Sequence, residues 1–164
     1  MANWSSSWLT FTGEEANVEK AKMMFKEMSD KEVQTNLGQI PDFIKEENTD
    51  GWFHQIMVDE TDIISFEAKW EPPIQTLKVI GKEMKVDFTL DYEELGNGLF
   101  GKAVYNHKED ELKTYILTKE DFDQYTTDEE TDTHTTCFIY NGQEYESEYE
   151  ILELIFEKKH GFAY

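Results

Sequence analysis

The stretch from 63 to 105 constrains the fold more than any other part of the sequence. Its first part, residues 64–70, alternates apolar and polar side chains, which is the period-two pattern of a half-buried strand. Pro72 and Pro73 end this strand and suit the first turn of a helix. Apolar residues then recur every three or four positions as far as Met84, so the sequence predicts a short amphipathic helix there.

The rest of this stretch predicts a pair of strands. Apolar and polar residues alternate again over 86–92, and a glycine-rich turn follows at 96–98. Because glycine adopts positive backbone angles at little cost, the segment 99–105 is expected to return antiparallel to 86–92. The same glycines follow a strand and precede a strand, and no Gly-Lys-Ser/Thr sequence is present, which argues against a phosphate-binding loop.

Weaker periodic patterns predict elements on both sides of this stretch. In chain order they are a strand over 9–12, a helix ending near Ser29-Asp30, a short strand over 52–58, a strand over 112–118, a short helix over 118–125, strands over 135–140 and 143–146, and a final helix over 147–159. Asn141-Gly142 is the strongest local hairpin signal. The acidic segment 126–133 is expected to be mobile.

The charge of the chain is its most unusual property. The sequence has 36 acidic residues and 15 basic residues, for a formal net charge of -21, and every basic residue is lysine. Arginine is the side chain best suited to phosphates and guanine edges, so its absence and the negative field argue against nucleic-acid binding. Such a field attracts a basic protein surface. The alternative is that the charge serves only solubility.

Several functional classes have no support in the residues. No long apolar run or basic leader is present, so the protein is expected to be cytoplasmic, without membrane contact. The single cysteine, Cys137, excludes an internal disulfide. Asp128, Glu130, Asp132 and His134 alternate, but they lack the glycine and glutamate of a calcium loop. We therefore expect no enzymatic activity, no cofactor and no metal site, although a chance carboxylate pair leaves a hydrolase open.

Two groups of residues carry a family resemblance. The opening Met1 to Trp4 with Leu9 to Gly13, and the central segment from Ile64 to Ile74 with the later Tyr92 and Gly96 to Gly101, resemble the Api-like (YubB-type) proteins of phages and plasmids. The resemblance implies an α+β, ferredoxin-like β-α-β-α-β-β core, with an antiparallel sheet and helices on one face. It also implies a mobile-element origin, and the family has no assigned activity.

Combining the residues with the resemblance gives a two-part organisation. Residues 1–110 are expected to form the ferredoxin-like core, with an insertion at about 30–60. Residues 111–164 are expected to form an acidic extension of strand, hairpin and helix, packed on the core. From 109 to 157 the chain has 16 acids and two lysines, so two-thirds of the net charge lies in under a third of the chain.

The acidic extension supplies the main hypothesis about function. We expect a non-enzymatic protein that binds a basic host protein, acting as a DNA mimic against a nucleic-acid-directed defence system. The predicted partner-binding residues are Asp128, Glu129, Glu130, Asp132, Glu144, Glu146, Glu150, Glu153, Glu157 and the aromatic Trp52. The alternative is a structural or assembly module with a merely solvating acidic surface, which self-associates through an edge strand or the aromatics near Trp52.

Overall fold

The computed structural model describes residues 3–130 and 135–164. Within them the chain forms a six-stranded sheet of β1 (Trp4–Thr12), β2 (His54–Val58), β3 (Ile63–Lys69), β4 (Asp87–Glu94), β5 (Leu99–Asn106) and β6 (Glu111–Ile116). A smaller sheet contains β7 (Thr126–Glu130), β8 (Thr135–Tyr140) and β9 (Gln143–Tyr145). The helices are α1 (Glu15–Thr35), α2 (Ile74–Met84), α3 (Lys119–Phe122) and α4 (Glu148–His160), with 3-10 turns η1 (Glu46–Asn48) and η2 (Leu95–Asn97).

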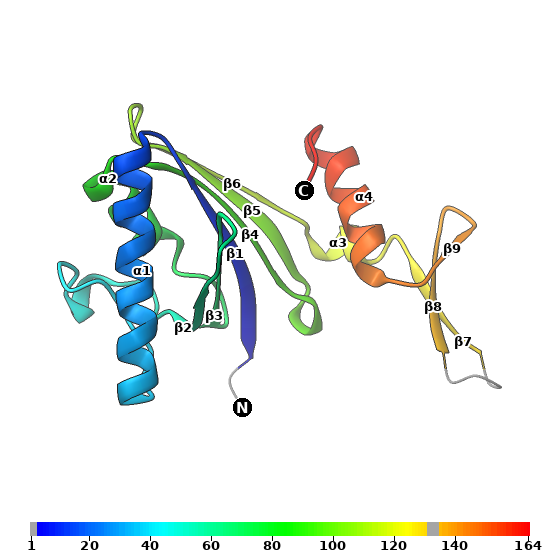
Figure 1. Cartoon of the computed structure of the whole chain (residues 1–164). Coiled ribbons are helices and arrows are strands. Elements are labelled where there is room, and N and C mark those ends of the chain that lie inside the picture. The colour runs from blue at the N-terminus through cyan, green and yellow to red at the C-terminus, as the bar shows by residue number, and fades with distance from the viewer. Residues whose placement is uncertain (1–2, 131–134) are drawn as a thin grey trace.

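The large sheet has the strand order of a ferredoxin-like domain. Its strands run β2-β3-β1-β4-β5-β6, and every neighbouring pair is antiparallel. The first four strands with α1 and α2 form the β-α-β-β-α-β unit, and β5 and β6 extend the sheet beyond β4. Both helices cover the same face of the sheet (Figure 1). The predicted ferredoxin-like α+β fold is confirmed.

One core strand lies where the sequence predicted an insertion. β2 falls within 30–60 and pairs with β3, so the unit has one strand more than the predicted β-α-β-α-β-β order. β2 contains a register shift at Gln55, whose φ is 49°. The carboxylate of Glu32 on α1 accepts hydrogen bonds from the amides of Gln55 and Ile56, at 2.8 and 3.0 Å. Because a distant side chain stabilises this bulge, local alternation did not reveal the strand's role.

The large sheet includes residues on both sides of the predicted domain boundary at residue 110. β6 was assigned to the extension, yet it pairs with β5 from Gly101↔Ile116 to Asn106↔Glu111. β7 also differs from expectation, since residues 126–130 form a strand against β8 in place of an irregular segment. Residues 131–133 of that predicted mobile segment are outside the described part of the chain. The hairpin predicted at Asn141-Gly142 is confirmed, because β8 and β9 pair on either side of it.

The main core lies between the sheet and α1. Phe25 on α1 is fully buried, and its ring lies 5.9 Å from the ring of Phe11 and 5.3 Å from that of Phe53. Phe66 of β3 stacks against the same ring at 6.5 Å. Aromatic contacts of this kind add to the burial of apolar area, so α1 is fixed on the sheet by its predicted apolar stripe.

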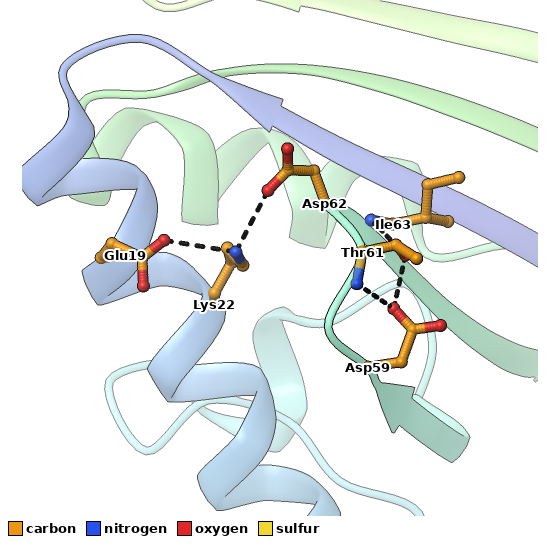
Figure 2. A network of polar contacts seen from close by, with 6 residues as sticks. All are labelled: Glu19, Lys22, Asp59, Thr61, Asp62 and Ile63. Carbon is orange, nitrogen blue, oxygen red and sulfur yellow. Dashed lines mark hydrogen bonds and ion pairs between the residues drawn. The ribbon is translucent and has the colours of Figure 1, made fainter.

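A polar network joins the N-terminal half of α1 to the turn between β2 and β3. Figure 2 shows Lys22 between Glu19 and Asp62, with its Nζ 3.2 Å from a carboxylate oxygen of each. In the same turn, the Asp59 carboxylate accepts a hydrogen bond from the Thr61 amide at 2.7 Å. The network orients the turn, although exposed ion pairs of this kind contribute little to stability.

A second core attaches α4 to the opposite face of the large sheet. Phe100 of β5 points away from α1, because Ala103 and Tyr105 on the same strand belong to the main core. Phe100 is fully buried and contacts three aromatic rings from α4 and the C-terminal tail, those of Tyr149, Phe156 and Tyr164. The smaller sheet lies beyond α4, away from β5 (Figure 1).

Candidate functional site

Helix α4 has one fully buried face and one acidic face. Its buried face consists of Ile151, Leu152, Ile155 and Phe156, none of which is more than 2% exposed. The next face carries Glu150, Glu153 and Glu157, as the three-and-four spacing predicted. Because the buried face is clamped on the second core, the acidic row is held on a rigid support.

The acidic row lines a depression in the surface. Glu150, Glu153 and Glu157 surround a pocket of about 320 Å³. Its remaining walls are the apolar or aromatic side chains of Tyr145, Leu154, Ala163 and Tyr164. Leu154 is 41% exposed inside this acidic surrounding. The surface therefore combines several carboxylates with exposed apolar area in one depression.

The row continues onto the large sheet. Burial raises the pKa of Glu153, and the neighbouring charges of Glu150, Glu157 and the β4 residue Asp91 raise it further. Burial likewise raises the pKa of Glu93 on β4, with a further contribution from Glu148. We call the six carboxylates Asp91, Glu93, Glu148, Glu150, Glu153 and Glu157 the α4 acidic cluster.

The pKa values of two tyrosines beside this cluster are raised by burial and by neighbouring charges. Burial raises the pKa of Tyr149 to about 12, and the charges of Glu153, Glu93 and Asp91 add to the effect. Burial also raises the pKa of Tyr164, whose hydroxyl donates a 3.0 Å hydrogen bond to the carbonyl oxygen of Tyr92. Both phenols therefore stay neutral at the edge of the cluster.

Of the lysines near the cluster, Lys102 pairs with its member Asp91, Lys159 pairs outside it, and Lys158 at the end of α4 is exposed. Lys102 Nζ lies 3.0 Å from Asp91 Oδ1 and 5.5 Å from the Tyr164 ring centroid, with a side chain only 11% exposed. Lys159 pairs with Asp121 on α3 and donates to the carbonyl of Ile116. One carboxylate oxygen each of Glu93 and Glu94 is buried without a hydrogen bond in the described part of the chain. Negative charge thus exceeds its local compensation.

The other predicted partner-binding acids are dispersed over the smaller sheet. Asp128 is exposed on β7 and Glu144 is exposed on β9. Glu146 was expected on the same strand face as Glu144, but β9 ends at Tyr145 and Glu146 lies in the bend that follows. The predicted strand over 143–146 is thus one residue longer than the strand that forms. Glu129 and Glu130 are in β7, and Asp132 lies outside the described residues.

Trp52 belongs to a different part of the molecule. It is half-buried in the loop before β2, which is the strand at the edge of the sheet opposite to β6. There it lines a separate pocket with His54, while Phe53 between them is fully buried in the main core. Trp52 and the α4 acidic cluster therefore do not form one surface.

Sequence reasoning missed the contribution of β4. Asp91 and Glu93 alternate with apolar residues, which correctly places them on the face away from α1. Their approach to α4 depends on Phe100 and on the tail residue Tyr164, which stacks on Phe100 with the ring centroids 4.0 Å apart. No local pattern announces such a contact between distant segments.

Removing the central carboxylate of the cluster is expected to stabilise the protein at neutral pH. Glu153 has a raised pKa, so its ionisation in the folded state is unfavourable once the pH exceeds its ordinary value of 4.5. Glu153→Gln should therefore raise the free energy of unfolding at pH 7, by about 0.2–0.5 kcal/mol for each like-charge helix pair removed. The gain should vanish below the ordinary pKa, where the carboxyl is protonated in both states.

Chemical denaturation at neutral and acidic pH checks this expectation. Glu19→Gln on α1 is the control, because Glu19 forms an ion pair with Lys22 and the substitution removes a favourable pair. An equal gain for both variants, or a gain for Glu153→Gln that persists in acid, would contradict the assigned repulsion.

Outside the cluster, His107 and Asp87 form a close pair of titratable side chains. His107 Nδ1 lies 2.7 Å from Asp87 Oδ1, and the same oxygen accepts a 2.8 Å hydrogen bond from the His107 amide. Burial alone would raise the pKa of Asp87, but the hydrogen bonds from His107 lower it overall. This pair links the end of β5 to the start of β4. Among the described residues, no group of three or more His, Cys, Asp or Glu side chains is arranged to hold a metal ion.

The strand order of the large sheet, with α1 and α2 on one of its faces, defines the chain as a protein with a ferredoxin-like domain. Its sequence matches the family described as "Ferredoxin-like domain in Api92-like protein" over residues 47–137, more than half of the chain. The chain belongs to this family. No curated protein and no solved structure matches the sequence. The match begins after β1 and α1, although β1 lies between β3 and β4 in the sheet. None of the described helices is long and apolar enough to cross a bilayer.

Proposed function

We propose that this member of the family is a non-catalytic protein that binds a basic protein surface through the α4 acidic cluster. The observation that carries the proposal is the row of Glu150, Glu153 and Glu157 around a partly apolar pocket, on a helix whose other face is fully buried. The pKa of Glu153, raised by burial and by neighbouring carboxylates, agrees with this crowding of negative charge. Carboxylates held close together repel one another, and a cationic partner that relieves this repulsion binds more favourably.

The surroundings of the cluster fit this role. The acidic row is fixed by a fully buried helix face, so a partner meets a preorganised surface and loses little side-chain freedom beyond the glutamates themselves. Tyr145, Leu154 and Tyr164 provide apolar area inside the ring of charges. Charge supplies orientation and a fast encounter, while the apolar area supplies contact energy.

The partner we propose is the nucleic-acid-binding groove of a basic host protein. Such grooves present lysine and arginine side chains spaced for phosphates, and the carboxylates of the cluster would take the place of phosphates. In this view the protein acts in a phage or plasmid as a DNA mimic that blocks a nucleic-acid-directed defence system in the cytoplasm. The net charge of -21 and the absence of arginine argue against binding of nucleic acid by the protein itself.

Neutralising the acidic row is expected to weaken this binding at least tenfold. The triple variant Glu150→Gln, Glu153→Gln, Glu157→Gln changes the net charge from -21 to -18 and keeps the size of the side chains. The measurement is capture of proteins from host lysate on the immobilised chain, followed by elution with short duplex DNA. We expect a DNA-binding protein that duplex DNA displaces, and a loss of capture as salt rises.

A matched control separates local charge from total charge. Glu27→Gln, Glu46→Gln, Glu60→Gln also gives -18, at exposed positions distant in sequence from the cluster. Equal capture by both triple variants would refute the proposal, as would capture that DNA does not compete with. Sedimentation gives the remaining contradictory outcome: a stable homo-oligomer that buries α4 would favour the structural or assembly module.

A further inference from the structure

A second pocket lies at the β2 edge of the large sheet, apart from the α4 acidic cluster. It has a volume of about 470 Å³ and is lined by the segment that follows α1, the loop before β2, the first residue of β2 and the last residue of β3. Its lining residues are Leu37, Gly38, Asp50, Gly51, Trp52, His54 and Lys69. This volume is in the range of pockets that hold small organic ligands.

The walls of the pocket are held in place by packing. A Cβ on Gly38 would lie 2.3 to 2.8 Å from three atoms of the His54 ring, so the ring rests directly on the Gly38 backbone. On its other side the ring meets Trp4 edge-on, with the centroids 4.8 Å apart. Gln39 and Phe53 exchange two backbone hydrogen bonds of 2.8 and 2.9 Å, which tie the loop to β2. The aromatic wall is therefore preorganised.

The charged groups of the pocket are not equally available. The carboxylate of Asp50 accepts hydrogen bonds from the amides of Gln75 and Thr76, at 2.7 and 2.9 Å, and so caps the N-terminus of α2. Lys69 is exposed and has no ion-pair partner within the described chain, and its Nζ lies 5.7 Å from the Trp4 ring centroid. Burial lowers the pKa of His54, which leaves its ring neutral at pH 7. Lys69 is therefore the available charged group among the lining residues, while Glu32 and Glu67 lie near His54 outside the lining.

These features select among ligand classes. A cation would be repelled by Lys69, and Asp50, the acidic residue that lines the pocket, is already engaged at the N-terminus of α2. A phosphate ester prefers several donors or a free helix N-terminus, and Asp50 already occupies the N-terminus of α2. Each additional negative charge on a ligand is also disfavoured by the net charge of -21. A single carboxylate matches the single lysine, and a flat ring matches the walls formed by Trp52 and His54.

We infer that this pocket binds a small planar aromatic molecule that carries one carboxylate, with the ring against Trp52 and the carboxylate on Lys69. The ligand is a free small molecule, and the site is independent of the partner surface on α4. Binding here gives the β2 edge of the domain a role separate from any protein partner.

Isothermal titration with naphthalene-2-carboxylate tests the inference, together with NMR of the tryptophan indole N–H signals. We expect one saturable site and a shift of the Trp52 signal. Lys69→Met should weaken binding about tenfold, because it removes a charge-assisted hydrogen bond. Lys20→Met on α1, an exposed lysine outside the pocket with the same charge change, should bind as the unmodified protein does.

Matched ligands complete the test. The neutral 2-naphthamide should bind the unmodified protein about tenfold more weakly than the carboxylate does, and should not distinguish Lys69→Met from the unmodified protein. The inference is overturned if naphthalene-2-carboxylate gives no saturable signal at millimolar concentration, or if Lys69→Met and Lys20→Met bind it equally. It is also overturned if cyclohexanecarboxylate or 2-naphthyl phosphate binds as tightly as naphthalene-2-carboxylate.

Discussion

Replacing Phe100 by alanine is expected to destabilise the protein by about 3–5 kcal/mol, the range for truncating a buried phenylalanine. Phe100 is fully buried and is the point where the sheet meets α4 and the C-terminal tail. Its ring centroid lies 4.0 Å from that of Tyr164, 5.5 Å from that of Tyr149 and 6.1 Å from that of Phe156. Alanine would remove all three ring contacts at once and leave a cavity in their place.

The loss should be regional, because the main core does not include Phe100. Hydrogen exchange of the variant should show α4 amides losing protection while amides of β1 and β4 keep theirs. Val104→Ala is the control, since Val104 lies on the same face of β5 and is 36% exposed. Loss of protection throughout the sheet would mean that both cores unfold as one unit and that the acidic extension is no separable part.

The fold could be predicted where one local pattern decided each element. Pro72 and Pro73 precede α2, which begins at Ile74, and Gly98 adopts the positive φ of 66° that the turn before β5 requires. Gly161 likewise ends α4 with a φ of 80°. In these places the chemistry of one or two residues restricts the backbone, so the sequence is sufficient.

Predictions failed where a long-range contact decided the structure. The first helix was expected to end near Ser29-Asp30, but α1 continues to Thr35. On the added turn, Glu32 accepts hydrogen bonds from β2. Thr12 and Glu15 have the spacing of a capping box, which predicts the start of the first helix. That box does not form, because Thr12 is the last residue of β1 and pairs with Asp87. Tertiary pairing overrides local signals in both cases.

The candidate site divides in the same way. The row Glu150, Glu153 and Glu157 could be predicted because helical spacing alone brings these residues together. The participation of Asp91 could not, since it depends on the docking of α4 through the second core. Glu144 and Glu146 would share one strand face only if the strand included both residues. β9 ends one residue earlier, at Tyr145, so Glu146 is not part of it.

Gly101 gives the second large effect, because the ring of Tyr92 occupies the space of its missing side chain. The two residues are directly opposed in the β4–β5 pair, and a Cβ on Gly101 would lie 2.5 to 2.7 Å from three atoms of the tyrosine ring and hydroxyl. Tyr92 is 3% exposed, and burial raises its pKa to about 12. Gly101→Ala should therefore destabilise the protein by about 2–3 kcal/mol, as overpacking of a core does.

The sign of this effect is diagnostic, because alanine at an ordinary strand position is more stable than glycine. In a Tyr92→Leu background the clash is relieved, so adding Gly101→Ala should cost at least 1 kcal/mol less than it costs alone, a coupling of about the size expected for residues in contact. Gly96→Ala is the control, since its nearest neighbour is the flexible end of the Glu94 side chain. Urea denaturation of the four proteins in this cycle measures the coupling, and strictly additive losses would exclude the proposed ring packing.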